Sequence, residues 1–173
     1  GKVDRRLLEA HQSVAHGYGW YATYVEALRQ TLAWKKTLDE AGRGGELESL
    51  ILQAGFGEYC AQLIGGLQMS QVEWARPAEM GASDEQIGAF ANHPAVRTLV
   101  RGGNTEAVRA RIAELVADGL ATGAFGDTGL DETLAMVRDQ FRRFAQEEVV
   151  PHAHDWHLRD ELIPAEVVAH MGE

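Results

Sequence analysis

Hydrophobic positions in the first 40 residues recur at steps of four and three. The members of this stripe are Leu7, His11, Val14, Tyr18, Tyr21, Val25, Leu28 and Leu32. This spacing places side chains on one face of a helix and is typical of the seam of a helical bundle or coiled coil. It predicts a helix from about Val3 to Leu38, which the glycine-rich turn at residues 42–45 brings to an end.

A second helix is predicted from about Glu46 to Arg76, because Pro77 follows and disfavours its continuation. Its glycines are numerous for a helix: Gly55, Gly57, Gly65 and Gly66. Small residues favour the close approach of a neighbouring helix, and the alternative is a loop or a backbone contact with a ligand near residues 65–66. Joined by a short turn, the two helices are expected to form an antiparallel hairpin.

Shorter helices are predicted after this hairpin. Ser83 and Gln86 have the spacing of a capping box, which opens a short helix. Asn104 is the expected N-cap of a further helix, and Gly119 is its expected C-cap.

The last quarter of the chain again carries apolar residues at steps of four and three. Asp131 is the expected cap of a helix that ends near Val150, before Pro151. A polar connection is predicted next, and Pro164 suits the first position of a last helix.

The predicted fold class is all-α, because no segment alternates for long between apolar and polar residues as a strand does. A long antiparallel helical hairpin with shorter helices forms a bundle-like module over residues 1–120. Residues 121–129 are rich in glycine and are predicted to be a linker. Residues 130–173 begin a second helical domain.

Composition and charge narrow the function classes. Apolar residues make up 45% of the 173 residues, enough for a packed core. The net charge of −10 disfavours binding to nucleic acid or to an anionic membrane. Cys60 is the single cysteine, which excludes an internal disulfide framework and a cysteine-rich zinc site. Because no apolar stretch suits a signal peptide or a membrane span, the expected compartment is the cytoplasm.

The common catalytic motifs are absent from the sequence. It has no Gly-Lys-Ser/Thr phosphate loop, no Gly-x-Ser-x-Gly elbow, and no His-Glu-x-x-His or Glu-x-x-His metal motif. We therefore predict no catalytic residue, no cofactor-binding residue and no metal ligand in this chain.

A metal site near the C-terminus would contradict that prediction. His152, His154 and His157 lie close together with Asp155 between them, and neutral imidazoles bind zinc, copper or nickel. No fourth ligand is evident, so hydrogen-bonded histidines at a surface or an interface are the favoured interpretation.

The first predicted helix carries residues that could form a nucleophile–base pair or a site for a planar cofactor. His11 and Ser13 point to different faces of a helix, so His11 is expected to be a satisfied, partly buried imidazole rather than a base. Aromatic side chains could stack on a planar cofactor, but at helical spacing they are more typical of a core or a subunit interface. These aromatic residues are Tyr18, Trp20, Tyr21, Tyr24 and Trp34.

The last quarter of the sequence resembles a known protein family. Residues 134–151 read LAMVRDQFRRFAQEEVVP, which resembles the opening helix of flavin-dependent acyl-CoA dehydrogenases. Trp156, the run IPAE at 163–166 and the run MGE at 171–173 are similar to the continuation of that family. The helical extension before this region resembles the methylsuccinyl-CoA branch of the family.

The resemblance implies a function for a longer enzyme. In the family, FAD takes hydride from the β-carbon of an acyl-CoA while a glutamate removes the α-proton, and electrons pass to an electron-transferring flavoprotein. The FAD-binding β-domain and the catalytic glutamate lie later in the family's chain, so no catalytic residue is carried over to this one. The expected role of the chain is structural, in a homo-oligomer or in shaping the substrate channel. The competing hypotheses are a freestanding helical protein-interaction module without flavin chemistry and a small metal-binding helical protein.

Overall fold

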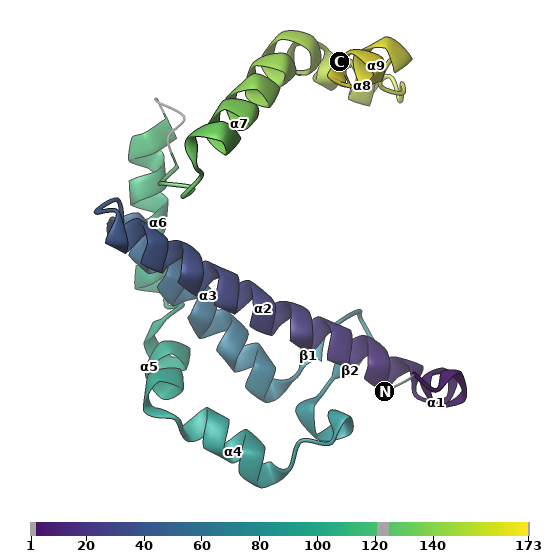
Figure 1. Ribbon diagram of the computed structural model, residues 1–173, viewed down its shortest axis with the longest axis vertical. Coiled ribbons are helices and arrows are strands. Elements are labelled where there is room, and N and C mark those ends of the chain that lie inside the picture. The colour runs from purple at the N-terminus through teal and green to yellow at the C-terminus, as the bar shows by residue number, and fades with distance from the viewer. Residues whose placement is uncertain (1–2, 121–124, 173) are drawn as a thin grey trace. The chain divides into compact units, whose positions relative to one another are not determined.

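The computed structural model describes residues 3–120 and 125–172, and the chain divides into two compact units, residues 1–127 and 128–173. Helices dominate both units (Figure 1). Within the described ranges, the strands are a single two-residue antiparallel pair. The predicted all-α class is therefore confirmed.

A helical hairpin forms the centre of the first unit. Helix α2 (Gln12–Glu40) and helix α3 (Glu46–Gly65) are joined by a short turn and pack along each other (Figure 1). The long first helix that we predicted is interrupted, because His11 leaves helical geometry with φ −129° and ψ 41°. The short helix α1 (Arg5–Ala10) precedes this break and is capped by Asp4.

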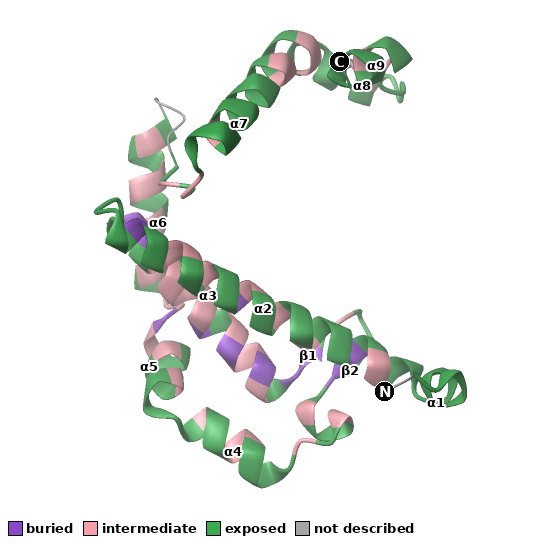
Figure 2. Ribbon diagram, viewed as in Figure 1, coloured by how far each residue is buried: buried purple, intermediate pink, exposed green. Residues whose placement is uncertain are grey.

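The covered face of α2 is displaced from the stripe that the sequence indicated. Its less exposed positions are Val14, Ala15, Gly17, Tyr21, Tyr24, Ala27, Leu28, Thr31, Trp34, Lys35 and Leu38. Val14, Tyr21 and Leu28 belong to both sets, whereas Val25 and Leu32 of the predicted stripe remain 52% and 44% exposed. The burial pattern in Figure 2 follows this division. The spacing predicted the helix correctly. The prediction that Val25 and Leu32 lie on its covered face is wrong.

The core of the first unit is small and lies between α2 and α3. Leu28, Cys60 and Leu63 are its buried cluster. Partly buried side chains pack around it: Tyr21, Tyr24, Phe56, Tyr59 and Val96. Tyr24 of α2 stacks on Tyr59 of α3 with ring centroids 4.4 Å apart, which joins the two helices by a direct aromatic contact.

Helix α3 ends at Gly65, so its predicted continuation to Arg76 is wrong. Gly66 has φ +109°, a conformation that glycine adopts without the steric cost of a side chain. The chain then forms β1 (Leu67–Gln68) and β2 (Trp74–Ala75), which pair Leu67 with Ala75. Leu67 is 1% exposed and Ala75 is 4% exposed. Burial of these two strand residues against the hairpin accounts for the early end of the helix.

Shorter elements complete the first unit: the 3₁₀ turn η1 (Pro77–Met80), α4 (Asp84–Asn92), α5 (Pro94–Gly102) and α6 (Glu106–Gly119). The predicted capping box is confirmed, because the Ser83 hydroxyl accepts from the Gln86 N–H and the Ser83 N–H donates to the Gln86 side chain. Thr105, and not Asn104, caps α6. The Asn104 amide donates instead to Glu58 at 3.0 Å, so a tertiary contact takes this side chain away from the helix end.

The second unit contains α7 (Glu132–Phe144), the π-helical turn η3 (Ala145–Val149), α8 (Val150–Leu158) and α9 (Ala165–Met171). Asp131 caps α7 as predicted. The predicted end near Val150 is wrong, because Pro151 lies in the first turn of α8, where a missing N–H is tolerated. None of residues 128–172 is buried.

The predicted linker over residues 121–129 lies partly outside the described residues, namely at 121–124. Its later part includes Asp127, which is held by the first unit. The Arg43 guanidinium donates to both Asp127 carboxylate oxygens, at 2.7 and 2.6 Å, and the Trp34 indole donates to the Asp127 carbonyl at 3.1 Å. The boundaries at 1–120, 121–129 and 130–173 stay a prediction.

Glu48 joins this segment to the start of α3. Its side chain is 5% exposed and accepts from the N–H groups of Gly45, at 2.9 Å, and Asp127, at 2.7 Å. Burial raises the pKa of this carboxyl, but the backbone N–H donors outweigh burial and hold the pKa below its ordinary value of 4.5. The ionised form therefore stabilises the folded state.

The glycines of α3 confirm close approach at one position. A Cβ added to Gly57 would lie 2.8 Å from the Leu99 carbonyl oxygen and 2.9 Å from the Gly103 Cα, both backbone atoms. Gly55, half a turn away on the same helix, has nothing within 4 Å of such a Cβ. The bare backbone at Gly57 is what lets the end of α5 lie against α3.

We expect Gly57→Ala to lower the free energy of unfolding by about 1–3 kcal/mol, because the new methyl group displaces backbone atoms of α5 and the turn after it. Gly55→Ala is the matched control and should raise stability by up to about 1 kcal/mol through helix propensity. Urea unfolding followed by circular dichroism measures both. Equal effects of the two substitutions would contradict the close contact.

We also expect Glu48→Gln to lower the free energy of unfolding by about 1–3 kcal/mol at pH 7. Glu48 accepts from the two N–H groups with different oxygens, and the amide would place its NH₂ group against one of them. The pKa of Glu48 is lowered by folding, so its stabilisation is complete above pH 4.5 and is lost as pH falls through the folded-state value. The difference between the two proteins should therefore shrink in acid. Glu40→Gln, at the exposed end of α2, is the control, and a difference independent of pH would argue against this role.

Candidate functional site

Part of the aromatic group packs against the core of the first unit, which confirms the core interpretation for Tyr21 and Tyr24. Tyr24 stacks on Tyr59, and the Tyr21 hydroxyl donates toward the Leu63 carbonyl at 3.2 Å. Burial raises the pKa of Tyr21. The Tyr21 and Tyr24 rings are therefore engaged inside the first unit.

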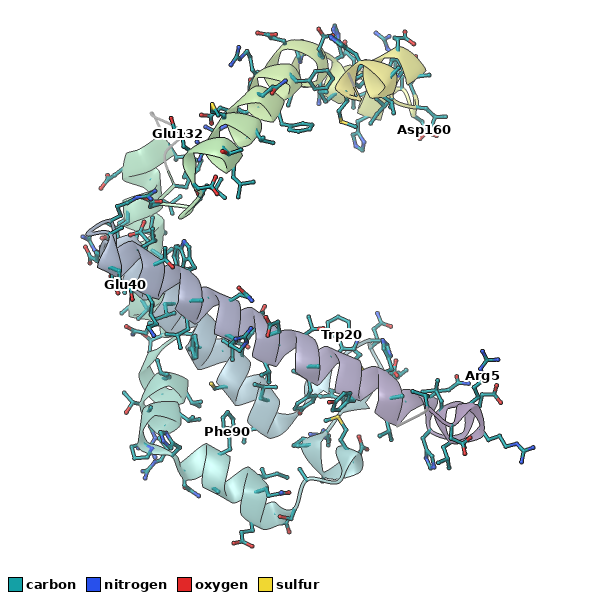
Figure 3. The ribbon with its side chains drawn as sticks, viewed as in Figure 1. Arg5, Trp20, Glu40, Phe90, Glu132 and Asp160 are labelled. Atoms are coloured by element: carbon teal, nitrogen blue, oxygen red, sulfur yellow. The ribbon has the colours of Figure 1, made fainter. Side chains whose placement is uncertain are left out.

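Tyr18 and Trp20 lie outside this core. Tyr18 is 67% exposed and Trp20 is 38% exposed. The Trp20 indole, labelled in Figure 3, donates to Nε2 of His16 at 2.9 Å, one turn earlier on α2. The Nδ1 atom of His16 lies 3.5 Å from the Glu73 carboxylate. This arrangement occupies both nitrogens of His16.

The nucleophile–base interpretation of the first histidines gains no support. His11 is exposed at the break between α1 and α2, so the expectation that it is partly buried is wrong. Ser13 is exposed as well. Cys60, the single thiol, is 4% exposed, and burial raises its pKa, which disfavours the reactive thiolate.

The later histidines lie on a helix and not in a polar connection. His152, His154 and His157 are all exposed on α8, and the His152 ring packs near the Trp156 ring with centroids 5.6 Å apart. Successive helical residues are about 100° apart, so His152 and His154 point to opposite sides. Over the residues described, no three His, Cys, Asp or Glu side chains are grouped so as to hold a metal ion.

An open apolar surface of the first unit follows α1 and α2. An open hollow of about 500 Å³ is lined by apolar groups from both helices and from η1, among them Leu7, Leu8, Tyr18 and Met80. Farther along α2, the same side of the helix carries a set that we call the outer stripe. Its members are Val14, Tyr18, Ala22, Val25, Arg29, Leu32 and Lys36.

The second unit presents a smaller apolar surface. A hollow of about 360 Å³ between α7 and α9 is lined mainly by Val137, Phe141, Phe144, His170 and Met171. The ring centroids of Phe144 and His170 are 5.4 Å apart in an edge-on contact. Large apolar side chains on α7 remain exposed, and a segment this short cannot bury a core by itself. The apolar side of α7 and α9 is therefore suited to being covered by further protein.

The described residues do not form a site that fits a flavin dinucleotide. Such a cofactor needs N–H donors for its pyrophosphate, usually from a glycine-rich turn at the start of a helix. The two hollows above are lined mainly by apolar groups. In the described ranges, every buried side-chain nitrogen and oxygen already has a hydrogen-bond partner.

Comparison with protein-family models gives a match at the end of the chain. Residues 131–173 match the family model described as "Acyl-CoA dehydrogenase, N-terminal domain". This is the region whose residues resembled that family. Residues 131–173 are therefore similar to the N-terminal domain of the acyl-CoA dehydrogenase family.

A relative extends the similarity over the first unit. The chain is 53% identical, over 175 aligned positions that cover all of it, to (2S)-methylsuccinyl-CoA dehydrogenase of Cereibacter sphaeroides. It spans 31% of the length of that relative. The resemblance of the extension to the methylsuccinyl-CoA branch is therefore confirmed. No helix in the described part of the chain is long and apolar enough to cross a membrane.

We expect zinc titration of the chain to show no stoichiometric tight binding, because His152 and His154 point to opposite sides of α8 and the described residues offer no group of three ligands. Isothermal titration calorimetry checks this, with His154→Ala as the comparison. A one-to-one complex that His154→Ala abolishes would restore the metal-site interpretation.

Proposed function

We propose that this chain is the N-terminal helical portion of an FAD-dependent acyl-CoA dehydrogenase that acts on methylsuccinyl-CoA. The observation that carries the proposal is the 53% identity to a (2S)-methylsuccinyl-CoA dehydrogenase, because it extends over the first unit as well as the second. The family segment at 131–173 alone would support only the broader class.

The chemistry in this proposal belongs to the rest of the enzyme. FAD, when bound, accepts hydride from the β-carbon of the thioester, and an electron-transferring flavoprotein is the proposed electron acceptor. The described residues of this chain do not fit the flavin, so no catalytic step is assigned to them. Their proposed contribution is to hold and shape the enzyme around its site.

The two units have different proposed roles. The second unit begins the N-terminal α-domain of the family, and the apolar groups that line its hollow pack against the remainder of that domain. The first unit has its own core and a large exposed apolar surface on α1 and α2. An exposed apolar surface of this kind marks an interface. We infer that the first unit packs on the rest of the enzyme or on a neighbouring subunit of a homo-oligomer, and thereby stabilises the assembly or shapes the substrate channel.

Deleting residues 1–127 from the full-length dehydrogenase tests this role. We expect a smaller or less stable oligomer, a higher KM for methylsuccinyl-CoA, or both, because the surface that the first unit covers is then exposed to water. Analytical ultracentrifugation measures assembly, and reduction of an artificial electron acceptor measures turnover.

Flavin absorbance is the control that the truncated enzyme still folds. Flavin-loaded truncated enzyme with unchanged assembly, KM and turnover would overturn the structural role. Full-length protein that neither holds FAD nor oxidises methylsuccinyl-CoA would overturn the proposed activity.

A further inference from the structure

The connection between α6 and α7 is held to the hairpin at Asp127. The N–H of Asp127 donates to Oε1 of Glu48 at 2.7 Å, and its carbonyl accepts from the Trp34 indole at 3.1 Å. Its two carboxylate oxygens accept from the Arg43 guanidinium at 2.7 and 2.6 Å. These partners lie 79 to 93 residues away in the sequence, so the contacts are tertiary and not a local turn. A residue bound at its N–H, its carbonyl and its side chain is fixed in both position and orientation.

Apolar burial does not account for this attachment. Leu120 and Phe125, which precede Asp127 in the connection, are 64% and 51% exposed. The buried partner is polar: Glu48 is 5% exposed, and a carboxylate at such a depth is costly unless N–H groups donate to it. Gly126 has φ +84°, and a Cβ added to it would lie 2.8 Å from Oε1 of Glu48. The connection is therefore attached by polar contacts that depend on a close approach of its backbone.

The attachment shortens the tether between the two units. Helix α6 ends at Gly119, and α7 begins at Glu132 after its cap, Asp131. With Asp127 fixed on the hairpin, residues 128–130 remain between the attachment and that cap. A segment of this length spans at most about 14 Å. A short tether restricts the arrangements that two joined parts can reach far more than a long one does.

We propose that Asp127 is a positioning residue: bound by Trp34, Arg43 and Glu48, it fixes the point and the direction in which the chain leaves the first unit for the second. The first unit is then an oriented part of the dehydrogenase, and not a module on a flexible glycine-rich linker. The proposal rests on the proposed function only in taking the second unit as the start of an enzyme domain.

A second ion pair of the first unit is the matched control. The Arg111 guanidinium donates to both carboxylate oxygens of Glu46, at 2.9 and 2.8 Å, and joins α6 to α3. Its side chain is 44% exposed, against 48% for Arg43. Both pairs therefore contribute to the stability of the first unit in a similar way. The Arg43 pair differs in binding the connection.

Hydrogen exchange of the full-length dehydrogenase, followed by mass spectrometry over residues 125–131, tests the attachment. Arg43→Gln and Asp127→Ala each remove one side of the ion pair, and each should speed exchange of this segment about threefold. The double variant should do no more than either single one, because both substitutions remove the same interaction. Arg111→Gln should leave the exchange of this segment unchanged.

Double electron–electron resonance tests the positioning itself. Spin labels on Gln30→Cys of α2 and Arg142→Cys of α7, both exposed positions, report the spread of distances between the two units. Labelled subunits are diluted with unlabelled ones so that each distance lies within one chain. We expect one narrow distribution in the labelled parent and with Arg111→Gln, and a distribution at least twice as wide with Arg43→Gln or Asp127→Ala. A role in stability alone would lower the melting temperature without changing this width.

Two results would overturn the proposal: distributions with Arg43→Gln and Asp127→Ala as narrow as in the parent, or equal broadening with Arg111→Gln. Flavin content and methylsuccinyl-CoA oxidation are measured on the same samples. Their absence in the parent protein would count against the proposed activity, whereas the distance distributions decide on the role of Asp127.

Discussion

The packing of α2 against α3 is the contact on which the first unit depends. Leu28 of α2 meets Cys60 and Leu63 of α3, and the Tyr24–Tyr59 stack closes one side of this small cluster. Few residues of the unit are fully buried, so these contacts carry a large share of the hydrophobic stabilisation. The remaining elements of the unit attach to this hairpin and have little core of their own.

The attachments are specific because they rely on backbone as much as on side chains. Gly57 lets the end of α5 reach α3, and Gly17 lets Ala75 of the strand pair reach α2. Gly66 turns the chain back after α3. At the opposite end, Glu48 and Arg43 bind the backbone and the side chain of Asp127. These contacts fix the strand pair, α5 and the segment around Asp127 to the hairpin.

The two units differ in how much of their apolar surface they bury. The first has a core and polar contacts at both ends, yet leaves the outer stripe and the adjacent hollow uncovered. The second has no buried residue in the described range 128–172. In the comparisons, the second unit matches an acyl-CoA dehydrogenase N-terminal domain model over residues 131–173, and the whole chain spans less than a third of its relative.

The sequence by itself determined the helical class, the hairpin, the caps at Ser83 and Asp131 and the family, because periodicity, capping and motif spacing are local properties. Only the tertiary structure decided which side of α2 is covered, since Val25 and Leu28 are equally apolar and differ only in whether α3 lies against them. It also decided that α3 ends at Gly65, where burial of Leu67 and Ala75 outweighs helix propensity. The Asn104 side chain does not cap α6, because it binds Glu58 instead. These outcomes depend on contacts between residues far apart in the chain, which local patterns do not record.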